Sequence, residues 1–205
     1  MTTSVELNAA ATDSGVDAAV AAARRVIAGL VRAGNMSGAD MDDIAARLDA
    51  VADELDRHAP DLEERLVDMW RGDGITRHEA VTGPENPIAP PLVYEGGDDG
   101  SIESEVTLDL PYQGPPASVH GGVSALLLDH TLGVANSWAG TAGMTAELTL
   151  RYRRRVPLFR PLTVTGRQVA VDGRKIRTVG SIWADGEECV TAEGLFIAKD
   201  LGRPR

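Results

Sequence analysis

The chain has 205 residues, of which 43% are hydrophobic and 25% are charged. This composition is typical of a globular protein and excludes a wholly disordered chain, and the length suits one enzymatic domain with an extension better than two enzymatic domains. The formal net charge of −11 argues against nucleic acid and membrane surfaces, so we expect neither as a partner.

Cysteine and histidine are too sparse for a metal centre. Cys189 is the only cysteine, which excludes an intramolecular disulfide. His58, His78, His120 and His130 show no ligand spacing, so we expect no metal and no cofactor. No apolar run approaches the roughly 20 residues of a membrane-spanning helix, and the first residues do not resemble an export signal, which predicts a cytoplasmic protein.

The sequence pattern of residues 1–75 predicts a helical extension. Apolar residues recur at helical spacing over 16–33, and Ser37 with Asp40 resembles a capping box at the start of a second helix. A third short helix is expected over 60–70. The apolar stripe of the second helix consists of Ile44, Leu48, Val51 and Leu55. Such helices bury little on their own, so we expect them to pack on the following domain or on a partner subunit.

Glycine and proline are dense before residue 100, which indicates a connector over 76–100 and a second domain over 101–205. From Ile102 to Leu110 apolar and polar residues alternate, as in a half-buried strand. Residues 121–139 are small and apolar nearly all round, as in a buried helix.

Four further strands are expected, and two of the breaks between them are Asp-Gly pairs, a strong hairpin signal. They cover 144–157, 161–171, 175–184 and 188–199. The order of one strand, one buried helix and a four-strand antiparallel meander predicts an α+β fold. In this fold an antiparallel sheet wraps around a central helix.

The start and the middle of the buried helix carry the candidate chemistry. Gly121 and Gly122 let a ligand approach first-turn N–H groups, which are unsatisfied donors at the positive end of the helix dipole. A polarised carbonyl or an oxyanion fits there. Asp129 lies among leucines, where a carboxylate is costly unless it is hydrogen-bonded or catalytic.

The spacing of these groups predicts an assembly. At a rise of about 1.5 Å per residue, Gly121 and Asp129 stand roughly 12 Å apart along the helix, too far to act on one carbonyl. If they share a reaction, each site takes Gly121 from one chain and Asp129 from the other. We therefore expect a homodimer, or a dimer of dimers, with active sites at the subunit interface.

The segment His120-Gly121-Gly122, followed by Asp129 and then by Thr145 seven residues before Tyr152, resembles the hotdog-fold acyl-CoA thioesterases of the phenylacetyl-CoA (PaaI-like) group. The resemblance covers roughly residues 101–200. It implies a hotdog fold in which the Gly121 amide polarises the thioester carbonyl and Asp129 activates water or attacks directly. It also implies that Thr145 helps to position water. The resemblance further implies that His120 orients the loop or hydrogen-bonds near the carbonyl, and a helix-capping role for its imidazole is the alternative.

One residue departs from this pattern, and a second, Thr145, matches it in type but not in the orientation that strand alternation predicts. Family members often carry Asn six residues before the histidine, where this chain has Gly114, and Gln113 is the candidate substitute by a register shift. Thr145 lies between the apolar positions of its strand, so strict alternation turns it away from the core unless a bulge near Gly143 re-aims it.

A basic patch occupies residues 151–177. Arg153, Arg155 and Arg160 are candidates to hold the phosphates of coenzyme A, because the guanidinium fork matches phosphate geometry. Arg154 falls on the opposite face of its strand. The alternative is that these charges only protect a sheet edge.

We therefore expect hydrolysis of acyl-CoA thioesters to a free acid and coenzyme A. A fatty acyl group is favoured because only 4% of residues are aromatic. Two alternatives remain. One is a non-catalytic acyl-CoA-binding or assembly module. The other is an enoyl-CoA hydratase or dehydratase on the same fold, with His120 or His130 beside an acid.

Overall fold

The computed structural model describes residues 7–10, 12, 14–36, 38–66 and 76–198. The chain begins with the helices α1 (Val16–Ala33), η1 (Gly34–Met36), α2 (Met41–His58) and α3 (Leu62–Arg65). The bounds of α1 are as predicted. The third helix was expected to run through Leu66 to Trp70, but α3 ends at Arg65 with Leu66 as its C-cap, and Trp70 lies outside the described residues.

The start of α2 differs from the prediction. Asp40 is the N-cap, and its carboxylate accepts a hydrogen bond from the amide of Asp43 at 3.0 Å. The capping box therefore does not begin at Ser37, which lies outside the described residues. An aspartate at the N-cap satisfies one of the free first-turn amides and places negative charge at the positive end of the helix.

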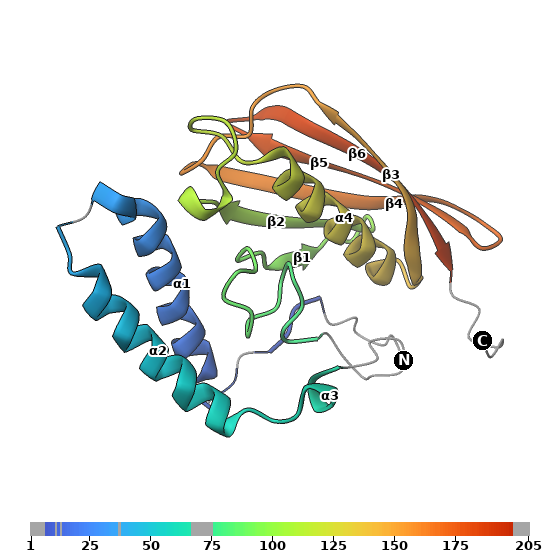
Figure 1. The fold of residues 1–205 in the computed structure, drawn as a ribbon. Helices are drawn as coiled ribbons and strands as arrows, with labels where there is room; N and C mark the ends of the chain where they lie inside the picture. Colours follow the sequence, from blue (N-terminus) through green and yellow to red (C-terminus); the bar gives the residue numbers. More distant parts are fainter. Residues whose placement is uncertain (1–6, 11, 13, 37, 67–75, 199–205) are drawn as a thin grey trace.

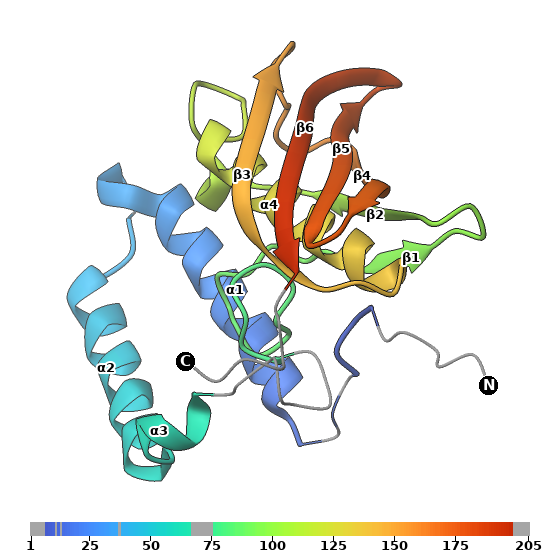
Figure 2. The same ribbon diagram turned by 90° about the vertical axis from the view of Figure 1, so that its right-hand side faces the viewer.

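The two long helices of the extension differ in how closely they approach the rest of the chain (Figures 1 and 2). Helix α1 lies against the short helix η2 (Leu110–Tyr112), and Val20 is its buried residue. Helix α2 lies farther out and has no buried residue. The assignment of 1–75, 76–100 and 101–205 as separate units stays a prediction.

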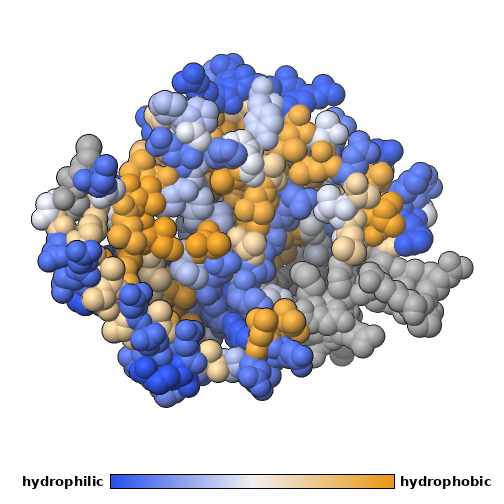
Figure 3. Space-filling view, in the orientation of Figure 1, coloured by the Kyte–Doolittle hydropathy of each residue, from blue (hydrophilic) through white to orange (hydrophobic). Residues whose placement is uncertain are grey.

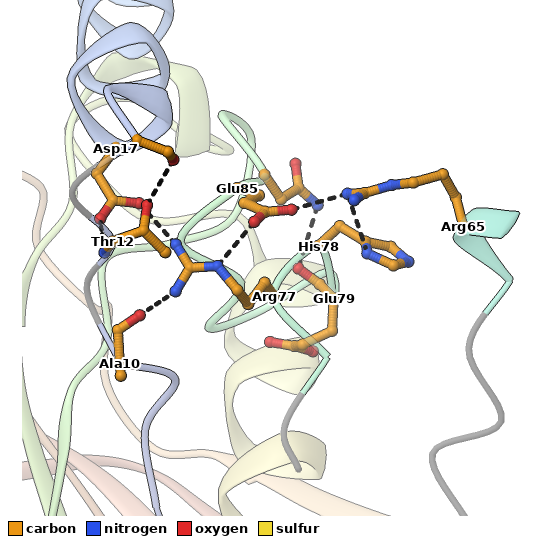
Figure 4. A network of polar contacts seen from close by, with 10 residues as sticks. Ala10, Thr12, Asp17, Arg65, Arg77, His78, Glu79 and Glu85 are labelled. Atoms are coloured by element: carbon orange, nitrogen blue, oxygen red, sulfur yellow. Dashed lines mark hydrogen bonds and ion pairs between the residues drawn. The ribbon is translucent and has the colours of Figure 1, made fainter. Parts of the chain in front are cut away.

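Arg77 ties the connector to α1. Its Nη2 lies 2.7 Å from Asp17 Oδ1, and its Nε lies 2.7 Å from Glu85 Oε1 (Figure 4). Arg65 Nη2 reaches the other Glu85 oxygen at 2.8 Å. Hydrogen bonds from Arg65 and Arg77 hold the pKa of Glu85 below its ordinary value. These contacts join three segments that are distant in sequence.

The described residues form one six-stranded antiparallel sheet in the order β1-β2-β4-β5-β6-β3. The strands are β1 (Tyr94–Gly96), β2 (Ser101–Thr107), β3 (Gly143–Tyr152), β4 (Pro161–Asp172), β5 (Lys175–Ala184) and β6 (Glu187–Ala198). The three residues of β1 lie in the expected connector and were not predicted. Strand β3 ends at Tyr152, before the predicted end at residue 157.

The predicted four-strand meander is wrong in one respect. Strands β4, β5 and β6 follow one another in space, but β3 pairs with β6 at the sheet edge and not with β4. The reason is that β2 pairs with β4, so both edges of β4 are already occupied by β2 and β5. Among the described residues, no strand pairs with the backbone edge of β3 that faces away from β6.

Helix α4 (Gly121–Trp138) lies across one face of this sheet (Figure 1). Glycines in the strands allow the close approach: a Cβ at Gly166 would lie 2.9 Å from Thr131 Cγ2, and one at Gly194 would lie 2.8 Å from Leu132 Cδ1. The buried residues of α4 are Ser124, Leu127, Leu128, Thr131, Leu132, Ala135 and Asn136. The predicted α+β fold, an antiparallel sheet around a central helix, is confirmed. No helix in the described ranges is long and apolar enough to cross a bilayer.

Candidate active site

The first turn of α4 is held by hydrogen bonds to three neighbouring groups. His120 is the N-cap, and its Nδ1 accepts a hydrogen bond from the Gly122 amide at 2.9 Å. The His120 amide donates to the Tyr112 carbonyl at 2.9 Å. The Tyr152 hydroxyl donates to the Gly121 carbonyl at 2.9 Å. The histidine thus has the capping role, and the orientation of Gly121 is set from both sides.

The Gly121 amide is the free donor of this turn. As the first residue of the helix it has no intrahelical acceptor, and it makes no hydrogen bond with another described residue. A surface hollow of about 440 Å³ is lined by Gly121, Ser124 and Tyr152 together with Arg153 and Arg155. The structure therefore places a helix N-terminus and basic side chains around one space, which suits an anionic or polarised ligand.

Thr145 and Asp129 meet because β3 contains a bulge. Thr145 pairs with Phe196 and Glu147 pairs with Leu195, so Ala146 is the extra residue. Phe196 is buried against the helix side of the sheet, and Thr145 shares that side. The Thr145 hydroxyl donates to Asp129 Oδ1 at 2.9 Å. The bulge lies three residues beyond Gly143 and re-aims the threonine, as bulges commonly do.

Asp129 is partly exposed, and Thr145 is exposed. One carboxylate oxygen accepts the threonine hydroxyl, and the second accepts no hydrogen bond from another described residue, so it can accept a proton or attack an electrophile. The threonine oxygen also keeps lone pairs that accept a hydrogen bond from water. This pair is the group in the predicted site that is equipped for base chemistry.

Two of the three candidate arginines lie together, and the third does not. Arg153 Nε lies 3.2 Å from Glu188 Oε2, and both this arginine and Arg155 line the Gly121 hollow. Arg160 pairs with Asp185 at 2.6 Å and does not line that hollow. Arg155 takes part in no ion pair within the described chain. Arg155 is therefore the cation of the group that is most available to a ligand.

A steric clash explains why position 114 is a glycine. A Cβ there would lie 2.6 Å from the Cα of His120, so an asparagine at this position would displace the loop that carries the histidine. Gln113 forms an isolated antiparallel bridge with Val119, and its exposed side chain makes no hydrogen bond with another described residue. The substitution of Gln113 for the missing amide stays a prediction.

His130 belongs to a different environment from that of its neighbour Asp129. Its Nδ1 lies 3.5 Å from Glu79 Oε2, its Nε2 lies 3.3 Å from Thr82 Oγ1, and its ring stacks on Tyr94 with centroids 6.0 Å apart. Burial lowers the pKa of His130, and the charge of Glu79 opposes the shift. The partners come from the connector, where sequence periodicity carries no signal. The printed contacts of His130 are thus with Glu79, Thr82 and Tyr94, whereas Asp129 is hydrogen-bonded to Thr145 of β3.

Comparison with known proteins covers both parts of the chain. A model of the thioesterase superfamily matches residues 117–191. A model described as the N-terminal helical domain of hypothetical protein RHA1_ro05818 matches residues 7–64. Within residues 7–198, no group of three or more His, Cys, Asp or Glu side chains with a metal-binding arrangement was found among those described.

Solved structures and curated relatives agree with these matches. The crystal structure of thioesterase superfamily protein RHA08564 is 57% identical, covers 92% of this chain and 97% of that chain, and has a TM-score of 0.84. A hypothetical thioesterase from Streptococcus pneumoniae, determined with coenzyme A, is 19% identical, covers 53% of this chain and 88% of its own, and has a TM-score of 0.50, which shows a shared fold.

The acyl-coenzyme A thioesterase THEM4 of Mus musculus is 34% identical over 97 residues, 46% of this chain and 42% of that protein. The bovine THEM4 is 36% identical over 93 residues, 44% of this chain and 38% of that protein. The chain thus spans less than half the length of the curated relatives it matches.

Proposed function

The chain belongs to the thioesterase superfamily, and from this premise we propose that it hydrolyses acyl-CoA thioesters to a free acid and coenzyme A, with Asp129 as the catalytic carboxylate. The observation that carries the proposal is the hydrogen bond from Thr145 to Asp129 across the bulge in β3. A carboxylate held by one oxygen and open at the other is suited to work on an electrophile beside it.

Asp129 acts as a general base or as a nucleophile. As a base, it takes a proton from a water molecule that the Thr145 hydroxyl helps to orient, and the resulting hydroxide attacks the thioester carbon. The carbon–sulfur bond then breaks, and the thiolate of coenzyme A leaves and takes up the proton. As a nucleophile, the carboxylate attacks the thioester carbon and expels the coenzyme A thiolate, which takes up a proton, to form an acyl anhydride. Water then hydrolyses the anhydride to the free acid and the regenerated carboxylate.

The Gly121 amide stabilises the oxygen that becomes negative during attack. A free N–H at a helix N-terminus is fixed before the reaction and needs no reorganisation when charge develops. The hydrogen bonds of His120 and Tyr152 keep the first turn in place, so these two are positioning residues for the amide.

We propose that a second copy of the chain completes the site. In one chain Gly121 and Asp129 are separated by about 12 Å of helix. The open edge of β3 is ten residues long, and open edges of this length favour pairing with another strand. Leu126 and Met144 are 40% and 58% exposed, and apolar side chains gather over α4 on the face seen in Figure 3. Pairing of two β3 edges would cover this face.

Acyl-CoA is the substrate that these groups fit. Arg153 and Arg155 line the same hollow as Gly121, and guanidinium groups hold phosphates through paired hydrogen bonds. The curated relatives are acyl-coenzyme A thioesterases. Leu126 and Met144 are exposed, and among the described residues Tyr152 is the one aromatic side chain that lines the hollow. Both observations favour an aliphatic acyl chain.

The test is hydrolysis of acetyl-, octanoyl-, palmitoyl- and phenylacetyl-CoA by the native chain and by the variant Asp129→Asn. We expect kcat of the variant to fall by roughly 10²- to 10⁴-fold, the usual contribution of a general base. Asp172→Asn, which removes the same charge from an exposed residue at the end of β4, should leave the rate unchanged.

Equal rates for Asp129→Asn and the native chain would remove Asp129 from the mechanism. Acyl-CoA binding without turnover of any of the four substrates would replace hydrolysis by the binding-module alternative.

A further inference from the structure

A cavity lies between the helical extension and the sheet domain. It has a volume of about 380 Å³ and is bounded by α1, by the connector and by η2. Its apolar wall includes Ile27, Val31 and Ile88, and its polar wall includes Arg24, Asp109 and Tyr112. A mostly apolar cavity of this size with a few polar groups at one end is typical of a small-molecule site.

Arg24 is the unusual member of this wall. Its Nη2 donates to the Asn86 carbonyl at 3.0 Å, while its Nε is buried and has no hydrogen-bond partner. It takes part in no ion pair within the described chain, in contrast to Arg77, which contacts both Asp17 and Glu85. Arg24 lines the cavity without a counter-ion from the described chain, so an anion placed there would gain a charge-assisted hydrogen bond to its guanidinium.

We propose that this cavity is a second binding site and that its ligand is a small aliphatic monocarboxylate. The carboxylate pairs with the Arg24 guanidinium, and the alkyl chain packs on Ile27, Val31 and Ile88. Asp109 lines the same cavity, and its negative charge disfavours a ligand with two or more negative charges. A single carboxylate therefore fits better than a phosphate or a dicarboxylate.

The cavity adjoins the candidate active site through one residue. Tyr112 lines the cavity, and its carbonyl accepts the hydrogen bond of the His120 amide at 2.9 Å. The helical extension, to which the active-site chemistry assigns no role, thus closes a cavity beside the loop that leads to Gly121. Asp129 takes no part in the cavity wall, so binding there does not depend on hydrolysis.

Isothermal titration calorimetry with octanoate tests the proposal on the full chain. Native protein and the Asp129→Asn variant should bind octanoate with equal affinity, because the variant keeps the cavity. Arg24→Gln should weaken binding about tenfold or more, the effect of losing one charge-assisted contact. Arg25→Gln, a change of the exposed neighbour on α1, should bind as the native chain does.

A second pair of variants separates binding from folding. Ile88 is 66% exposed and lines the cavity, whereas Val93 is 61% exposed and does not. Neither Ile88→Asp nor Val93→Asp removes core packing, and Ile88→Asp alone should weaken octanoate binding. Equal affinity in the native, Arg24→Gln and Ile88→Asp chains would overturn the proposal. Inorganic phosphate or octan-1-ol binding as tightly as octanoate would overturn it as well.

Discussion

Helices α2 and α4 have the same length of 18 residues and opposite surroundings. Seven residues of α4 are buried, while α2 has none. The sequence of α2 has the clearer amphipathic stripe, and that of α4 is apolar nearly all round. An apolar stripe therefore predicts that a segment is helical, but it does not predict what the helix packs against. A helix that is apolar on most of its faces is predicted to be buried, because such a helix is stable only when other elements cover it.

The strands explain why α4 is enclosed. Gly166 and Gly194 leave room for Thr131 and Leu132 at distances where a Cβ would clash, so the helix lies close to the sheet and its dispersion contacts are dense. Helix α2 instead relies on local interactions, including the Asp40 cap and the exposed ion pair of Arg47 with Asp43 at 3.1 Å.

The largest expected effect is a loss of stability when a buried leucine of α4 is shortened. Leu132→Ala removes a fully buried side chain that packs against Gly180 and Gly194, and should lower the free energy of unfolding by about 2–5 kcal/mol. Leu55→Ala on α2, where the side chain is 66% exposed, should change it by less than about 0.5 kcal/mol. Urea unfolding measures both changes in the free energy of unfolding. Similar values for the two variants would contradict the difference in packing between α4 and α2.

A polar group of α4 gives the next largest effect. Asn136 Oδ1 accepts hydrogen bonds from Thr178 Oγ1 at 2.5 Å and from Gln168 Nε2 at 3.1 Å. Asn136→Ala leaves the buried Thr178 hydroxyl without this acceptor and should cost about 1–3 kcal/mol. The same substitution in Thr178→Val protein should cost clearly less. A cost that is unchanged by Thr178→Val would show that the two side chains are not coupled.

The cap of α2 should have a smaller and local effect. Asp40→Ala removes the acceptor of the Asp43 amide and should lower the stability of α2 by about 1 kcal/mol. Because α2 has no buried residue, hydrogen exchange of its amides should speed up while the urea midpoint of the sheet domain stays constant. A shift of that midpoint would mean that α2 supports the sheet. Asp53→Ala, in the middle of the helix, is the matched control.

The pH dependence of stability should be the weakest effect. Burial lowers the pKa of His130 from its ordinary value of 6.5, so below that pH the unfolded chain binds a proton that the folded chain does not. The contribution of neutral His130 is therefore complete above about pH 6.5 and is lost as the pH falls toward the folded pKa. His130→Gln should flatten this part of the stability curve. An equally steep loss in the variant would assign it to other groups.

Local patterns predicted much of the fold. The ends of α1, the start of α4 and the two Asp-Gly turns between β4, β5 and β6 follow from capping, glycine and hairpin signals that act within a few residues. The place of β3 beside β6 did not follow, because it depends on the pairing of β2 with β4, more than 50 residues apart in the chain.

The candidate site shows the same limit. The glycines and Asp129 stand out in the sequence as backbone and charge anomalies in an apolar helix. The orientation of Thr145 depends on a bulge at Ala146, which no turn residue marks. The contacts of His130 come from Glu79, Thr82 and Tyr94 in or beside the connector, where a periodic pattern is absent.

The proposed mechanism requires an active site that is shared between two chains. The variant Gly121→Pro makes this requirement testable. Proline is tolerated at the first position of a helix and removes the amide N–H. His120, with φ −62° and ψ 136°, already has the conformation that precedes proline. An added Cβ would meet Tyr152 at an ordinary 3.5 Å. The backbone should therefore be unchanged while the proposed oxyanion donor is lost.

The decisive measurement is acyl-CoA hydrolysis after Asp129→Asn and Gly121→Pro chains are dissociated, mixed in equal amounts and reassociated. A mixed dimer contains one site with an intact Asp129 from one chain and an intact Gly121 from the other. Since half of the dimers are mixed, the account predicts recovery of about a quarter of native activity from two inactive parents. Activity that stays at the level of the parents, with mixed dimers present, would contradict it.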